Sequence, residues 1–90
     1  MPRVTIASAL QRHVPQPPTT VAAATVREAL EAVFADNPRL RGYVLGDQGD
    51  LRHHVAVFVD GRSVTDSRRL ADPVAPGARI DVINGGRSAA

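Results

Sequence analysis

The chain has 90 residues, which is enough for one compact domain with one hydrophobic core and too little for a second. Its eleven arginines, spread from Arg3 to Arg87, face nine acidic residues and leave a formal charge of +2, so neither a nucleic-acid surface nor a membrane surface is expected. Without cysteine, and without an apolar stretch long enough for a signal peptide or a membrane helix, we expect a cytoplasmic protein with no disulfide and no thiolate metal site.

The first predicted element is a strand at residues 3–7, where Val4 and Ile6 alternate with polar side chains. Such alternation is typical of a half-buried strand. The proline-rich run 13–18 restricts φ and lacks several backbone donors, so we expect a loop there. Residues 19–23 then supply a second strand, which forms a hairpin with the first.

A helix is predicted to begin at Thr25. Thr25 and Glu28 fit a capping box, in which the Thr25 hydroxyl accepts from the Glu28 amide and the Glu28 side chain reaches back. Arg27 and Glu31 face outward as an i, i+4 pair. One apolar stripe follows at helical spacing and should face the core: Val26, Leu30, Val33 and Phe34.

The segment after this helix is predicted to contain a loop and then the clearest strand. The Asn-Pro pair at 37–38 ends the helix and offers the cap of a short second helical turn through residues 40–45. Residues 46–50 form a flexible loop. Residues 53–59 alternate and end in the Asp60-Gly61 turn, with three valines on one side: Val55, Val57 and Val59.

The last part of the chain is predicted to return to the sheet. Residues 62–64 form a short return strand, residues 70–74 an irregular turn, and Pro76-Gly77 a tight turn. Residues 79–83 form the final strand, with Ile80 and Val82 inward. The order is β-β-α-β-β, with residues 62–64 as one further, minor strand, and a right-handed crossover through the helix gives an α+β fold with a mixed sheet and one helix across it.

Three features resemble the ubiquitin-like sulfur carriers: the helix opening at 25–30, the strand and turn at 54–61, and the last strand leading to Gly85-Gly86. The resemblance covers about residues 3–86. It implies a β-grasp, ubiquitin-like domain over residues 1–84, with a mixed four- to five-stranded sheet and one main helix, and a flexible tail over 85–90. The insert from residue 39 to 52 is more similar to the molybdopterin synthase small subunit and the cysteine-synthesis carrier than to the thiamine-biosynthesis carrier.

The resemblance also implies a mechanism, in which the chain is a carrier and not an enzyme. An E1-like adenylating enzyme uses ATP to activate the carboxylate of Gly86, which is then exchanged to a thiocarboxylate. The sulfur passes to an acceptor or synthase subunit in cofactor biosynthesis. Gly85 gives clearance, because glycine lacks Cβ and permits close backbone approach. The chain itself is expected to bind no cofactor and no metal.

The sequence departs from the family because it continues past the second glycine through residues 87–90. An internal peptide bond cannot be adenylated as a carboxylate. We therefore predict that a protease cuts between Gly86 and Arg87. The alternative is a non-covalent β-grasp interaction module, or a protein modifier, that lost or never had sulfur-carrier chemistry.

Other side chains carry weaker predictions. His53 and His54 are adjacent and should point to opposite faces of a strand, which is poor geometry for one metal. Phe58 falls on the open face of the sheet if the valines face the helix, and it then marks a partner surface; otherwise it faces inward or lies under residues 70–74. Arg68 and Arg69 could meet an acidic groove on the activating enzyme. With no lysine, the chain could act in conjugation as donor only, apart from its amino terminus.

Overall fold

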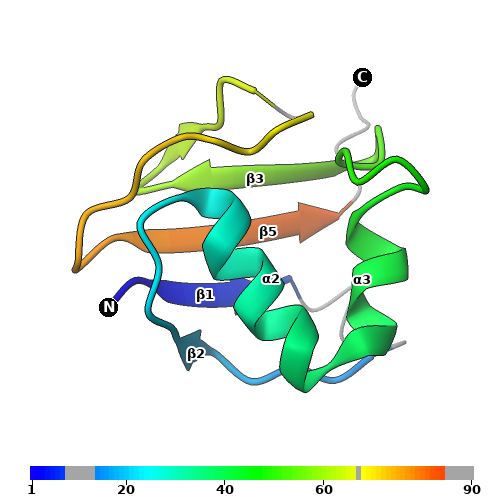
Figure 1. Cartoon of the computed structure of the whole chain (residues 1–90), viewed down its shortest axis with the longest axis horizontal. Coiled ribbons are helices and arrows are strands. Elements are labelled where there is room, and N and C mark those ends of the chain that lie inside the picture. Colours follow the sequence, from blue (N-terminus) through cyan, green and yellow to red (C-terminus); the bar gives the residue numbers. More distant parts are fainter. Residues whose placement is uncertain (8–13, 67, 85–90) are drawn as a thin grey trace.

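A five-stranded sheet with a helix packed across one face forms the body of the protein (Figure 1). The computed structural model describes residues 1–7, 14–66 and 68–84. Its elements are β1 (Arg3–Ile6), β2 (Thr19–Thr20), α2 (Val26–Asp36), α3 (Pro38–Val44), β3 (Val55–Val59), β4 (Arg62–Ser63) and β5 (Arg79–Asn84). Neither α2 nor α3 is long and apolar enough to cross a membrane.

The strand order is β2-β1-β5-β3-β4, and the sheet is mixed. β1 runs parallel to β5, with Val4 opposite Ile80, whereas the other neighbouring pairs are antiparallel. The parallel pair requires a crossover, and α2 lies within it. The predicted α+β class with a mixed β-grasp sheet is confirmed.

The core is aliphatic and lies between α2 and the sheet. On the sheet side, side chains on alternate positions are at most 2% exposed: Val4, Ile6, Val57, Ile80 and Val82. The predicted helix stripe is buried in full, and Ala29 joins it. Burying each such side chain contributes about 1.5–3 kcal/mol, so this two-layer contact is the main stabilising term.

The start of α2 is capped as predicted, with one difference. The Thr25 hydroxyl accepts from the Glu28 amide at 3.2 Å. Glu28, however, reaches one residue beyond the usual target and accepts from the amide of Ala24 at 2.8 Å. The amides of Glu28 and Ala24 are thus satisfied by side chains.

The observed bounds of several elements differ from the predicted ones. β2 stops at Thr20, since the Val21 amide bonds to the Pro2 carbonyl and the chain then turns toward α2. β3 begins at Val55 and not at residue 53. α3 ends at Val44, and the side chain of Asn37 does not cap it but donates to the loop at Pro15.

The turn between β3 and β4 confirms the Asp60-Gly61 prediction. Both residues have positive φ, 50° and 87°. These values fit a two-residue type I′ hairpin, in which glycine at the second position avoids the Cβ penalty. The Asp60 carboxylate also accepts from the Arg79 amide at 2.9 Å, which ties the turn to the start of β5.

Thr25→Ala removes the side-chain cap of α2 and should lower the free energy of unfolding by about 1 kcal/mol. Urea denaturation at neutral pH measures this change. Thr20→Ala is the matched control, because Thr20 is exposed on an edge strand and should cost less than about 0.5 kcal/mol. Equal losses in the two variants would show that the cap contributes nothing specific.

Candidate functional site

The predicted reactive end follows directly from β5, which ends at Asn84. Asn84 pairs with Val55 of β3, so the chain leaves the sheet between its central strands and not from an edge. Gly85, Gly86 and Arg87 lie outside the described residues, and the processing and activation sites assigned to them remain predictions. The structure does describe the residues that surround the end of β5.

The turn before β3 lies at this point, because His54 immediately precedes Val55 (Figure 1). His53 and His54 are exposed, and their rings are edge to face with centroids 5.7 Å apart. The prediction that they point to opposite faces of a strand is wrong, since both lie in the turn before the strand begins. No group of three metal-ligating side chains occurs within residues 1–7, 14–66 and 68–84.

The open face of the sheet carries an apolar patch close to the end of β5. Ala56 lies opposite Ile83 and Phe58 lies opposite Asp81, on the face away from the buried Val57. Ile83 is 41% exposed and Phe58 is partly buried. The alternative that Phe58 faces the helix is therefore excluded.

Residues 70–74 do not cover this patch either. The Val26 amide bonds to the Asp72 carbonyl at 3.0 Å, and the Val74 amide bonds to the Ala24 carbonyl at 2.9 Å. These bonds hold the segment against the amino-terminal end of α2, on the helix side of the sheet. Phe58 thus belongs to the open face, as the partner-surface prediction requires.

Arg68 and Arg69 lie in an exposed turn that is held by Asp66. The amides of Arg69 and Arg68 donate to the Asp66 carboxylate at 3.0 and 2.9 Å, and these bonds hold the pKa of that carboxyl below its ordinary value of 3.8. Leu70 closes the turn with a φ of 56° and a fully buried side chain. The turn is therefore anchored in the core while its two arginines face solvent.

Arg27 is a residue whose role the sequence did not reveal. It makes the predicted pair with Glu31 at 3.5 Å, but its guanidinium also donates to three backbone carbonyls. These belong to Gly49 at 2.8 Å, Arg68 at 2.8 Å and Arg69 at 3.0 Å. One side chain of α2 thereby joins the 46–50 and 66–70 loops.

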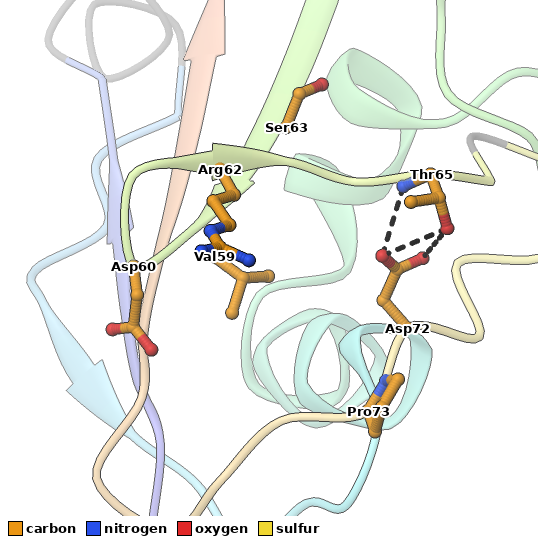
Figure 2. Close-up of a pocket in the computed structure, with 7 residues that line it drawn as sticks. All are labelled: Val59, Asp60, Arg62, Ser63, Thr65, Asp72 and Pro73. Atoms are coloured by element: carbon orange, nitrogen blue, oxygen red, sulfur yellow. Dashed lines mark hydrogen bonds between the residues drawn. The ribbon is translucent and has the colours of Figure 1, made fainter.

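A third region is a cavity of about 550 Å³ between the β3–β4 hairpin and the segment around Asp72 (Figure 2). Thr65 and Asp72 are hydrogen-bonded in its wall, where the amide and the hydroxyl of Thr65 donate to the Asp72 carboxylate at 3.0–3.2 Å. Arg62 projects toward Val59 inside it. Since Arg62 pairs with Val59, at the other end of β3 from Val55, the cavity is remote from the end of β5.

Arg27→Ala removes the hydrogen bonds to three carbonyls and should lower the free energy of unfolding by about 1–3 kcal/mol. Urea denaturation measures the loss, and hydrogen exchange should show faster amide exchange at Leu70. Arg39→Ala is the control, because Arg39 is exposed on α3. A loss for Arg27→Ala no larger than that of the control would contradict the role assigned to Arg27.

Comparison with known proteins places this geometry among solved structures. No protein-family model and no curated protein sequence matches the chain. SAMP1 from Haloferax volcanii is 23% identical, with a TM-score of 0.81 over 98% of each chain. A chain of the Amycolatopsis orientalis BexX/CysO complex is 17% identical, with a TM-score of 0.81 over 99% of this chain and 100% of that one.

A further match is Mycobacterium tuberculosis CysO, which is 20% identical with a TM-score of 0.78, over 93% of this chain and 98% of that one. These identities are low, but the alignments span nearly the whole of each chain. The TM-scores show that the fold is shared over this length. The chain has the ubiquitin-like β-grasp fold, which it shares with these solved structures of SAMP1 and CysO.

Proposed function

We propose that the chain is a sulfur carrier that works covalently at Gly86 after residues 87–90 are removed. The observation that carries the proposal is the placement of the Gly-Gly pair. Asn84 is the last residue of a central strand, and the two glycines follow it at once. The folded domain thus supports a narrow peptide whose end can enter the active site of another protein.

The chemistry of activation belongs to the partner. A carboxylate oxygen of Gly86 bonds to the α-phosphorus of ATP and pyrophosphate leaves, which gives an acyl adenylate. Hydrosulfide then attacks the acyl carbon and AMP leaves, which gives a thiocarboxylate for transfer to the acceptor. The chain contributes the terminal carboxylate and the surfaces by which the adenylating enzyme and the acceptor recognise it.

The open-face patch supports recognition of a partner beside the reactive end. Ala56 and Ile83 pair with each other, and Phe58 is the next residue of β3 on the same face of the sheet. Because Ile83 is the residue before Asn84, a partner that covers this patch also reaches the start of the tail. Arg68 and Arg69 offer a second, cationic contact for an acidic groove.

A protein modifier is the second candidate, because SAMP1, which has a similar structure, is by name small archaeal modifier protein 1. A modifier shares the activation step and differs in the acceptor, which is then an amine of another protein. Covalent adducts on lysines of other proteins would distinguish it from a sulfur carrier.

A chain ended at Gly86 should support ATP–pyrophosphate exchange with the E1-like adenylating enzyme of the same genome. The full chain ending at Ala90 should not, because its Gly86 carbonyl is in a peptide bond. Exchange of radiolabelled pyrophosphate into ATP measures the difference. No exchange by the shortened chain would favour a non-covalent interaction module.

Processing can be tested separately by intact-mass spectrometry of the chain expressed in its native host. The expected mass corresponds to loss of the four residues 87–90, with Gly86 at the new carboxyl terminus. Gly86→Pro should block the cut, since the altered residue changes the backbone at the scissile bond. A chain that always keeps Ala90 would contradict processing.

A further inference from the structure

The turn that precedes β3 forms a basic rim beside the end of β5. Val55 pairs with Asn84, and Arg52, His53 and His54 come directly before Val55 in the chain. All three side chains of this rim are exposed. We call Arg52, His53 and His54 the exit rim, because the chain leaves the sheet beside them.

The exit rim is held in place by backbone and side-chain hydrogen bonds. The Arg52 amide donates to the Val44 carbonyl at 3.1 Å, and the Val55 amide donates to the Arg52 carbonyl at 2.9 Å. The Arg52 Nε donates to the Gly42 carbonyl at 2.7 Å, which fixes the side chain over the end of α3. A partner that binds here therefore meets a surface that is already ordered, which reduces the entropy cost of binding.

The exit rim also borders two hollows and carries nitrogen atoms that can donate hydrogen bonds to a partner. A hollow of about 300 Å³ lies on one side, lined by Asp50 and the whole rim, and another of about 250 Å³ is lined by Gly42, Tyr43, Arg52 and His54. Among the described residues, the ring nitrogens of both histidines and the two terminal nitrogens of Arg52 take part in no hydrogen bond. Among the described residues that line the two hollows, Asp50 is the only acidic one.

Because Gly86 follows Asn84 by only two residues, an enzyme that reacts with Gly86 must bind close to the exit rim. Two residues separate Asn84 from the far end of Gly86, and two extended residues span at most about 7 Å. An enzyme that reacts with Gly86 must therefore bring the mouth of its active site to within a few ångströms of the end of β5. The exit rim lies at that position.

We propose that Arg52, His53 and His54 form the docking surface for the adenylating partner, and that this partner carries carboxylates around the mouth that receives Gly85-Gly86. The inference rests on the proposed function and adds to it the residues and the charge of the contact. A planar guanidinium can donate two parallel hydrogen bonds to one carboxylate, and an imidazole N–H group can donate one. Docking at the rim positions the tail for reaction, while the rim itself touches no reacting atom.

The test is steady-state ATP–pyrophosphate exchange with carriers that end at Gly86 and the E1-like enzyme of the same genome. Arg52→Glu should raise the KM for the carrier at least about tenfold, with little change in kcat, because charge reversal sets like charges against each other at the contact. His53→Gln with His54→Gln should raise KM about threefold to tenfold. Added salt should raise the KM of the parent more steeply than that of Arg52→Glu.

Arg62→Glu is the matched control, since it makes the same charge change at the opposite end of β3 and should leave KM within about twofold. Thermal unfolding of each variant checks the fold, and if Arg52→Glu is unfolded the histidine variant decides. Equal KM values for the parent and the folded rim variants, or equal effects of Arg52→Glu and Arg62→Glu, would overturn the docking surface and leave the carrier function standing. No exchange by the parent would overturn the carrier function, and the docking proposal with it.

Discussion

The pairing of β5 between β1 and β3 is the constraint on which the rest of the molecule depends. Ile80 and Val82 of β5 are buried against α2, and a shift of one residue would turn both toward solvent. The register is therefore set by burial, and it places Asn84 opposite Val55. The position at which β5 ends, and from which residues 85–90 follow, is thus a consequence of core packing.

The 46–50 and 66–70 loops are held in place by hydrogen bonds from the Arg27 side chain. The Arg27 guanidinium has hydrogen-bond donors only and donates to carbonyls of two loops, so a charged group supplements the few apolar side chains of these loops. Leu70 supplies the one deep apolar anchor of its turn. Together they hold the backbone of Arg68 and Arg69 in place, while both side chains stay exposed.

The predictions that succeeded rest on residue type and spacing. Alternating valines identify β3, and Thr25 with Glu28 marks the start of α2, because burial and capping leave a signature in the sequence. The failures involve groups without such a signature. Every residue has a carbonyl, so nothing in the sequence shows which ones Arg27 meets, and His53 looks like part of the strand until the turn bonds that begin at Arg52 are seen.

The absence of lysine and cysteine suits the proposal that Gly86 is the reactive end. An acyl adenylate reacts with amines and thiols, and this chain has neither lysine nor cysteine. Its arginines remain protonated and are poor acceptors for an acyl group. Exposed cations such as Arg52 and Arg68 can therefore contact an acidic partner without competing for the activated carbonyl. Apart from its amino terminus, the chain has no amine that could take an acyl group from another copy.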